Sequence, residues 1–247
     1  MDQRPLIVVP DTHAHLREVE AVLNYCERQG LLSTHRLVFL GDYLDRGPDS
    51  RGLIDLCIDY QKKGHIFLMG NHEYVLLKVL DATFVNSWVM RWYLRYEENL
   101  LASYGVDKPI DNVFSSYSLS IIIDELREAM PSSHLDFLRS LPYYYETEDL
   151  ICVHAGLKMT SWRKQKKELN GDNFSKDQIG PDQIFSRELA LAKKHGAKKL
   201  VVSGHISGPR PTISHDKKHL CLHCGIDYGG PLVIWISDQN KYLQLKR

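Results

Sequence analysis

The sequence predicts an α/β fold with a cluster of polar side chains at one edge of a sheet. Short β-branched apolar runs recur along the chain, and a motif containing Asp, Asn or His follows each of them directly. Helix-length periodic segments separate most of these runs. Because α/β proteins bind their ligands at the carboxyl ends of successive strands, the same pattern also predicts where the functional site lies.

The length and composition are those of one domain, expected to span residues 1–247. A hydrophobic fraction of 43% is enough for a sizeable core. The formal net charge is zero, so we expect no nucleic-acid partner. The first apolar run, residues 6–9, is too short for a signal peptide or a membrane span, so no membrane association is expected. A neutral chain without an interaction tail makes a monomer the default expectation.

The cysteines are expected to be reduced thiols of a cytoplasmic protein. Their number, five, is odd, and no disulfide framework is evident. Cys221 and Cys224, with His219 just before them, resemble half of a structural zinc site. No second ligand pair stands at a matching spacing, so buried thiols are the preferred interpretation.

The expected strands are short and end at polar motifs. Residues 6–9 lead to Asp11-Thr12-His13, residues 37–40 to Gly41-Asp42, residues 66–69 to Gly70-Asn71-His72, residues 150–153 to His154, and residues 200–202 to Gly204-His205. Two more strands are expected at 220–223 and 232–236, around a turn at Gly229-Gly230.

The expected helices fill the connections between the strands. They cover residues 16–29, 50–63, 73–80, 119–130, 132–141 and 186–195. Gly30 and Gly64 are natural stops for the first two, and Pro131 separates the fourth from the fifth. The segment 158–183 is the most polar part of the chain, with a basic cluster at 163–167. We expect a polar loop or short helix there, which either overhangs the active site or is only a solvent-facing connection.

Taken together, the polar motifs predict a metal centre. Each motif alone has an ordinary explanation, since Asn71 is also a good helix N-cap and His154 and His205 are also acceptable as buried core histidines. Chance is a poor explanation for all five motifs together, because each of them stands at the end of an expected strand. Oxygen and imidazole ligands gathered at one sheet edge are typical of a site for divalent metals.

The predicted centre holds two divalent ions. The predicted ligands are Asp11 and His13 for one ion, Asn71, His154 and His205 for the other, and Asp42 as the bridge between them. Mixed oxygen and nitrogen ligands favour Mn²⁺, with Fe or Zn²⁺ as alternatives, over Ca²⁺. Two such ions about 3.5–4 Å apart bind phosphate oxygens and lower the pKa of a shared water, and the resulting hydroxide attacks phosphorus in line.

Residues beside these ligands are expected to supply acid catalysis and phosphate binding. His72 follows a ligand and is the candidate general acid for the leaving alcohol. Asp45 is expected to orient His72 by accepting a ring N–H. Arg46 is a candidate bidentate phosphate clamp, and Asn71 is placed at the same phosphate. Arg187 is a second candidate clamp, for which the alternative is an ordinary exposed helix residue.

With these motifs the chain resembles the calcineurin-like metallophosphoesterase superfamily. It is most similar to the phosphoprotein phosphatase family, with its bacterial serine/threonine phosphatase and symmetrical diadenosine tetraphosphatase branches. The decisive element is Asp45-Arg46-Gly47 after Gly41-Asp42, and Val153-His154-Ala155-Gly156-Leu157 looks like the bacterial branches. The resemblance covers residues 7–232. It implies a four-layer fold, in which a central β-sandwich is flanked by helices and the dinuclear site lies at the carboxyl ends of strands.

Two departures from the family pattern lie close to the predicted site. The first motif normally reads Gly-Asp-x-His-Gly, but here Pro10 and Ala14 replace both glycines and His15 adds an imidazole. The lost N–H and the added Cβ are expected to alter how the backbone approaches the ions. Near the C-terminus, His223-Cys224-Gly225 stands where the family has Asp-Thr-Gly, so an acid is lost. All predicted ligands remain, and activity is still expected.

The leading functional prediction is a phosphatase acting on phosphoserine or phosphothreonine in proteins. The alternative is a symmetrical hydrolase of diadenosine tetraphosphate or related dinucleoside polyphosphates, for which the basic cluster at 163–167 suits the phosphate chain. Either way, the expected partner is a phosphoprotein or a small phosphorylated substrate. A third interpretation is a non-catalytic binding protein, but a scaffold has no use for His72, Asp45 and Arg46.

Overall fold

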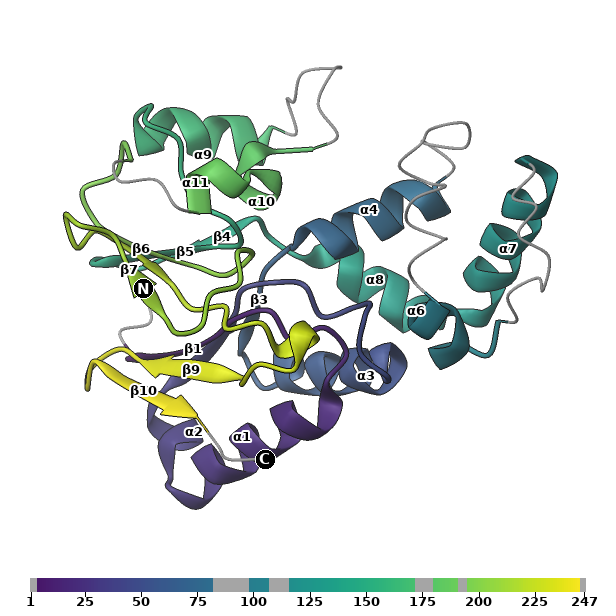
Figure 1. Ribbon diagram of the computed structural model, residues 1–247, viewed down its shortest axis with the longest axis horizontal. Coiled ribbons are helices and arrows are strands. Elements are labelled where there is room, and N and C mark those ends of the chain that lie inside the picture. The colour runs from purple at the N-terminus through teal and green to yellow at the C-terminus, as the bar shows by residue number, and fades with distance from the viewer. Residues whose placement is uncertain (1–3, 82–97, 107–115, 172–179, 191–194, 245–247) are drawn as a thin grey trace.

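The computed structural model describes residues 4–81, 98–106, 116–171, 180–190 and 195–244. Within these ranges the chain forms two five-stranded sheets with helices on their outer sides (Figure 1). The strand order is β10-β9-β1-β2-β3 in the first sheet and β4-β5-β6-β8-β7 in the second. That residues 1–247 form a single domain stays a prediction.

The elements of the structure have the following bounds. The strands are β1 Leu6–Val9, β2 Arg36–Phe39, β3 Ile66–Phe67, β4 Tyr144–Glu146, β5 Leu150–Val153, β6 Leu200–Ser203, β7 Thr212–Ile213, β8 His219–Cys221, β9 Val233–Ile236 and β10 Lys241–Gln244. The helices are α1 Leu16–Arg28, α2 Leu31–Thr34, α3 Ser50–Lys62, α4 Asn71–Leu80, α6 Glu98–Ser103, α7 Ser116–Ala129, α8 Ser132–Ser140, α9 Trp162–Asn170, α10 Asp182–Phe185, α11 Arg187–Ala190 and the 3-10 turn η1 Ile226–Tyr228.

Parallel pairing brings the polar strand ends together. In the first sheet β1, β2 and β3 are parallel, with Val9 opposite Phe39. In the second sheet β5, β6 and β8 are parallel, with Cys152 opposite Val202 and Ser203 opposite Cys221. The remaining strands pair in antiparallel fashion. The motifs that follow the parallel strands therefore leave each sheet from one end.

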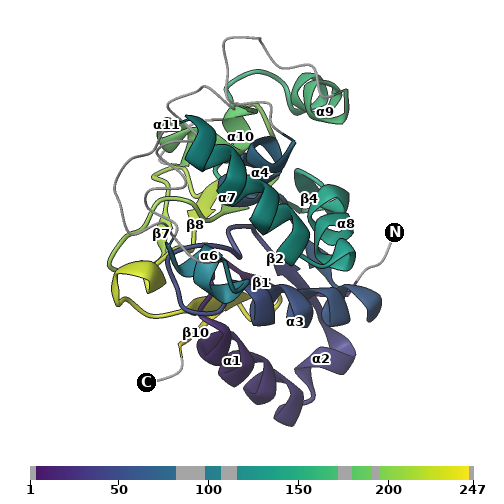
Figure 2. The ribbon, with the colours of Figure 1, turned by 90° about the vertical axis from the view of Figure 1, so that its right-hand side faces the viewer.

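Side chains alternate between two apolar layers along the central strands, which explains the layered architecture. In β1, Ile7 packs into the core beneath the helices, whereas Leu6 faces the second sheet. In β5, Cys152 joins Leu6 between the sheets, whereas Ile151 packs with Trp162 of α9 on the outer side. Helices α1 and α3 thus cover one sheet and α9 the other (Figure 1), while α4, α6, α7 and α8 gather on one side (Figure 2). The predicted α/β fold, two mixed sheets flanked by helices, is confirmed.

The sequence pattern misses three strands, β4, β7 and β10, and all of them are sheet edges. β7 is exposed and β10 is largely exposed. An edge strand of this kind is defined by pairing with its neighbour and not by an apolar face of its own, so it leaves little signal in the sequence.

The polar segment 158–183 contains α9 and the start of α10. Helix α9 buries Trp162, Gln165 and Leu169 and keeps its other residues toward solvent. Residues 172–179 lie outside the described residues, as do residues 191–194 of the helix expected at 186–195. Among the described helices, none is long and apolar enough to cross a membrane.

Candidate metal centre

The loops after β1 and β2 lie against each other and turn their polar side chains toward one point. The N–H groups of Thr12 and His13 both donate to the carbonyl oxygen of Asp42, at 3.0 and 2.9 Å. His13 and Asp42 have left-handed backbones, with φ of 40° and 55°. Such conformations are uncommon for non-glycine residues and cluster at functional sites. As a result, the Asp42 carboxylate lies 3.8 Å from Nε2 of His13.

A buried carboxylate on α4 fixes the loop after β2. Glu73 accepts hydrogen bonds from the backbone N–H groups of Asp42 (2.8 Å), Tyr43 (2.7 Å), Leu44 (3.2 Å) and Gly70 (3.1 Å). Burial, followed by the nearby charge of Asp42, raises the pKa of Glu73 to about 7. In the sequence Glu73 is recognisable only as the start of a helix, because its acceptor role depends on a loop distant in the sequence.

Two glycines allow backbone segments to touch the central carboxylates. A Cβ on Gly70 would lie 2.3 Å from the backbone nitrogen of Asp42, and a Cβ on Gly204 would lie 1.9 Å from Oδ1 of Asp11. Neither position has room for a side chain. The close approach at Gly204 lets the N–H of His205 donate to both carboxylate oxygens of Asp11, at 2.9 and 3.1 Å.

Three imidazoles that face the centre are anchored by their outer nitrogens. Nδ1 of His13 and Nδ1 of His154 lie 3.1 and 2.9 Å from backbone carbonyl oxygens. Nε2 of His205 lies 3.1 Å from the carbonyl oxygen of Phe185. Because a carbonyl accepts only from an N–H, the inner nitrogen of each neutral ring carries the lone pair that a metal requires.

The inner atoms surround Asp42. Oδ1 of Asn71 lies 2.9 Å from Nε2 of His154 and 3.0 Å from Nδ1 of His205. Oδ2 of Asp42 lies 3.3 Å from Nε2 of His154. Ligand atoms of Asp42, His154 and His205 lie within 4.8 Å of one another, and Asp42 and His13 form a second such group together with His72. The structure therefore brings the predicted ligands of both ions together, and their binding of metal stays a prediction.

The electrostatics of the centre favour a bound cation. Burial and the charge of His72 lower the pKa of His13 to about 3, and burial and His154 lower that of His205 to about 4, so both rings are neutral. Burial opposes ionisation of Asp42, but His154 and His72 outweigh it and hold its pKa well below the usual value. Burial likewise opposes the charged form of His154, but Asp42 outweighs it and raises that pKa to about 9. The carboxylates therefore attract positive charge to this position, held by the His154 proton without metal, and a bound metal would take the place of that proton.

His72, Asp45 and Arg46 lie together beside the ligands. Nδ1 of His72 is 2.6 Å from the buried carboxylate of Asp45. Nε2 of His72 points the other way, 3.9 Å from Oδ2 of Asp42 and 3.3 Å from Nη2 of Arg46. Arg46 also forms an ion pair with Asp227, whose carboxylate is fully buried. The expected acid and the expected phosphate clamp thus face the same space as the ligands.

Arg187 and His15 make no such contacts. Arg187 is exposed at the start of α11, and no hydrogen bond or ion pair joins it to another described residue. Nδ1 of His15 lies 2.7 Å from the carbonyl oxygen of His13, which is a local contact. Ala14, at a glycine position of the family pattern, is buried with φ 56°. The altered first motif therefore keeps a left-handed turn that glycine adopts without strain.

The cysteines are free thiols, all of them buried. Sγ of Cys221 lies 3.2 Å from the carbonyl oxygen of Gly204, and Sγ of Cys224 lies 3.3 Å from that of Leu222. Nε2 of His219 lies 2.8 Å from the hydroxyl of Ser203. These contacts are those of packed core side chains, as the buried-thiol interpretation predicts.

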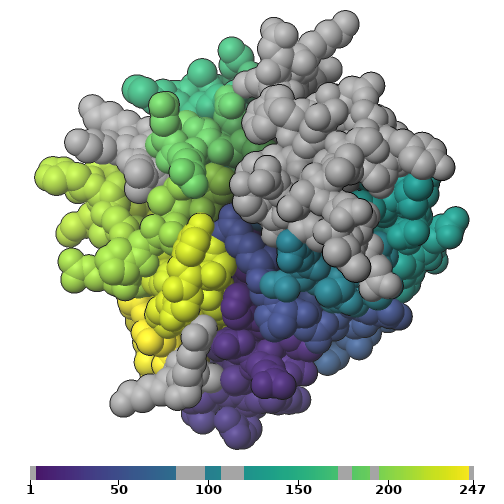
Figure 3. Space-filling view, turned by 45° about the vertical axis from the view of Figure 1, so that its right-hand side comes forward, coloured from purple at the N-terminus to yellow at the C-terminus, as the bar shows by residue number. Residues whose placement is uncertain are grey.

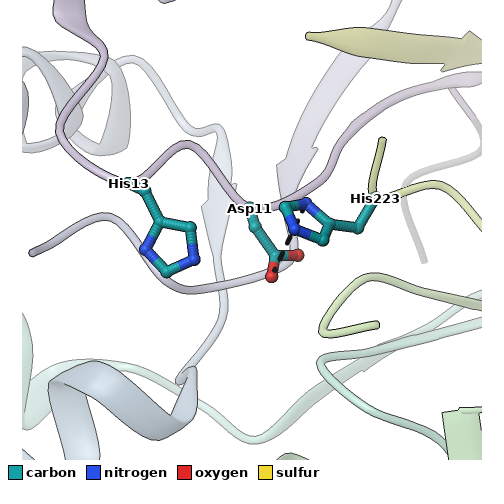
Figure 4. Close-up of side chains that lie close together, drawn as sticks. All are labelled: Asp11, His13 and His223. Atoms are coloured by element: carbon teal, nitrogen blue, oxygen red, sulfur yellow. Dashed lines mark ion pairs between the residues drawn. The ribbon is translucent and has the colours of Figure 1, made fainter. Parts of the chain in front are cut away.

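His223 is a residue of the centre that the predicted ligand set lacks. It follows β8, its side chain is 2% exposed, and its Nδ1 lies 3.9 Å from Oδ2 of Asp11 (Figure 4). Ligand atoms of Asp11, His13 and His223 lie within 4.8 Å of one another. Figure 3 shows the yellow segment near the C-terminus lying against the purple and blue N-terminal part of the chain. The signal in the sequence was the imidazole that stands in place of the family's acid.

The chain matches the sequence model of the calcineurin-like phosphoesterases over residues 4–237. It therefore belongs to the calcineurin-like phosphoesterases. As a member of this family it is a phosphate-ester hydrolase with candidate ligand groups for divalent metal, which confirms the expectation of an enzyme.

Similar proteins are phosphatases by their descriptions. A Caenorhabditis elegans protein described as a "putative serine/threonine-protein phosphatase" is 32% identical over 74 residues, which cover 29% of this chain and 20% of that protein. A crystal structure described as "a putative diadenosine tetraphosphatase" has a TM-score of 0.64 at 18% identity and covers 98% of this chain and 93% of its own. The structure of a Saccharomyces cerevisiae protein serine/threonine phosphatase has a TM-score of 0.55 at 15% identity, and the match covers 99% of this chain and 80% of that one. At these identities the two structures show a shared fold.

Proposed function

We propose that this phosphoesterase is a serine/threonine-type protein phosphatase that works with two divalent metal ions. The observation that carries the proposal is the placement of His72, Asp45 and Arg46 beside the predicted ligands of both ions. This combination offers a general acid, a residue that orients it and a phosphate clamp, which together suit hydrolysis of a phosphate monoester.

The residues present fit a pair of divalent ions. Carboxylate and imidazole atoms form three groups of three, each with its atoms within 4.8 Å of one another, and Nδ1 of His223 is buried there without a hydrogen bond. We propose that one ion is held by Asp11 and His13, the other by Asn71, His154 and His205, and both by Asp42. When bound, such ions hold phosphate oxygens and lower the pKa of the attacking water. The mixed donor set supports Mn²⁺, with Fe or Zn²⁺ as alternatives.

His72 is the proposed proton donor to the leaving oxygen. The Asp45 carboxylate lies 2.6 Å from Nδ1, so it fixes the ring and favours the protonated imidazole. Nε2 faces Asp42 and Arg46. Because a guanidinium only donates, Nε2 is proposed to carry the proton when Arg46 turns its N–H groups to the phosphate instead. Donation of this proton spares the leaving group from departing as an alkoxide.

Arg46 is the proposed phosphate clamp. Asp227 holds one end of its guanidinium, which lies 5.8 Å from the centre of the Tyr228 ring, and its side chain is 34% exposed at the rim of the centre. A planar guanidinium fixed in this way can bind two oxygens of one phosphate. Arg187, which lies on the exposed helix α11, remains a candidate second clamp on the prediction from sequence alone.

Within the basic segment at 163–167, Lys166 gives little support to a polyphosphate substrate. Lys166 pairs with Glu146 at 2.8 Å, and Glu146 also pairs with Lys199 at 2.8 Å. Glu146 lies opposite Ile151 near the amino end of β5, whereas the predicted ligand His154 follows the carboxyl end. Lys166 is therefore directed to the end of the sheet opposite to the metal centre, which favours a monoester substrate.

The alternative proposal is a symmetrical hydrolase of dinucleoside polyphosphates. The observation that favours it is the likeness in fold, over almost the whole of both chains, to the protein described as a diadenosine tetraphosphatase. The two activities use the same chemistry at phosphorus and differ in the substrate that the rim of the centre accepts. In both proposals the protein is a cytoplasmic monomer, as its composition predicts.

The test is a comparison of kcat/KM for Mn²⁺-loaded protein on a phosphothreonine peptide and on diadenosine tetraphosphate, with products identified by chromatography. Preferential release of phosphate from the peptide supports the proposal, and preferential release of ADP from the dinucleotide supports the alternative. The variant His72→Asn should lose turnover on the preferred substrate. His134→Asn is the matched control, because His134 is equally buried but contacts Tyr104 and Asp55 outside the centre.

A further inference from the structure

One nitrogen in the centre makes no hydrogen bond. Nδ1 of His223 is buried and makes no hydrogen bond. The nearest acid, Asp11, places its Oδ2 3.9 Å away, which is too far for a hydrogen bond. Leaving a polar atom unsatisfied in the interior costs roughly 1–3 kcal/mol, so the position of His223 needs an explanation.

The spacing fits two ligands of one ion. Atoms that are each about 2.0–2.2 Å from a shared ion can be up to about 4 Å apart. Nδ1 of His223 and Oδ2 of Asp11 meet this limit at 3.9 Å, and the ligand atom of His13 completes a group within 4.8 Å (Figure 4). The missing hydrogen bond and the suitable spacing therefore both point to an ion between these side chains.

The other side of the ring faces Asp227. Nε2 of His223 lies 3.3 Å from Oδ1 of Asp227, and both side chains are buried, at 2% and 0% exposure. Metal-binding imidazoles usually have a carboxylate or carbonyl at the outer nitrogen, which sets the tautomer and the orientation of the ring. The arrangement around His223 thus matches that of His13, whose outer nitrogen faces a backbone carbonyl.

We propose that His223 is a ligand of the ion held by Asp11 and His13, and that Asp227 is the positioning residue that orients it. Because Asp227 also pairs with Arg46, the same carboxylate fixes a metal ligand and the phosphate clamp. This inference rests on the two-ion site of the proposed function.

The extra imidazole has a consequence for metal preference. Imidazole nitrogen suits Zn²⁺ and Fe, whereas carboxylate oxygen suits Mn²⁺ and Mg²⁺. Replacing His223 by Asp changes the donor at one ligand position from nitrogen to oxygen. The site formed with Asp11 and His13 should then lose affinity for Zn²⁺ relative to Mn²⁺. A purely structural role of His223 would not produce such a change.

The test measures metal binding directly. Metal-free full-length protein is titrated with Zn²⁺ and with Mn²⁺ against a chromophoric chelator, and ions per chain are counted by mass spectrometry after dialysis. His223→Gln should weaken one of two sites by more than about 100-fold and leave the other site nearly unchanged. Asp227→Asn should weaken the same site by about 10–100-fold, the range typical of residues that orient a ligand. His223→Asp should lower the Zn²⁺/Mn²⁺ affinity ratio of that site at least tenfold.

The matched control is His219→Gln, which alters another buried histidine of the same segment that contacts Ser203. It should keep both ions, and circular dichroism of every variant checks that the chain is folded. Retention of both ions at wild-type affinity by folded His223→Gln would overturn this inference alone. Failure of the wild-type protein to bind two ions would instead overturn the proposed function.

Discussion

The substitution Gly204→Ala tests how tightly the backbone holds the metal centre. The added Cβ would lie 1.9 Å from Oδ1 of Asp11, while real contacts of this type are longer than 3.0 Å. The carboxylate or the loop after β6 must therefore move by more than about 1 Å. Metal–ligand distances tolerate only about 0.2 Å, and a shift of about 1 Å in an active site can cost roughly 10²-fold in rate. The shift would also disturb the hydrogen bonds from His205 to Asp11, at 2.9 and 3.1 Å.

We expect Gly204→Ala to lose affinity for at least one ion and to lower kcat/KM by about 10²-fold. Gly208→Ala is the matched control in the same loop, because a Cβ there meets its nearest neighbour at an ordinary 3.5 Å. Chelator competition measures the affinity, and phosphate release from a phosphothreonine peptide measures the rate. If Gly204→Ala bound two ions as tightly as Gly208→Ala, the close approach of this loop to Asp11 would not be a requirement of the site.

Three further perturbations address the bridge, the acid and the core. Asp42→Asn should release both ions, because the bridging position loses its charge; wild-type metal content in this variant would exclude the bridge. His72→Asn should lower kcat by about 10²–10⁴-fold with both ions retained, and equal losses on good and poor leaving groups would argue against a general acid. His65 is 7% exposed, accepts from the N–H of Leu37 at 3.2 Å, and has a pKa lowered by burial from 6.5 to about 4. Between pH 7 and 4 the unfolded chain therefore binds more protons than the folded chain. The free energy of unfolding should fall by on the order of 2 kcal/mol as the pH decreases from 7 to 4. Denaturant unfolding of metal-free protein should show a flatter pH dependence for His65→Gln, and an unchanged slope would refute the assignment.

The fold could be predicted as far as buried strands determine it. Runs such as 6–9 and 150–153 are apolar on both faces because they lie between two apolar layers, and this pattern is visible in the sequence. The edge strands β4, β7 and β10 could not be predicted, because their existence depends on the neighbour with which they pair. For α9 the sequence does not decide between a loop and a short helix, since the buried face of this helix consists of few residues, among them Trp162 and Leu169.

The site could be predicted where its residues occur in local motifs. Asp42, Asp45 and Arg46 are close in sequence, so one loop suffices to bring them together. The hydrogen bonds of Glu73 and the pairing of Asp227 with Arg46 join segments far apart in the chain, so no local sequence pattern predicts them. In the sequence His223 is visible only as the replacement of an acid, because the direction of its ring depends on how the turn after β8 meets the loop after β1.

The ligands come from both sheets, with Asp11 after β1 and Asp42 after β2 on one side and His154 after β5 and His205 after β6 on the other. Two metal ions bound here would act as a reversible cross-link between the two sheets and would close a very long loop of the chain. An isolated half of the molecule presents only part of the coordination, so tight metal binding and correct docking of the sheets become one event. Metal content would then report the natively assembled fraction of a preparation.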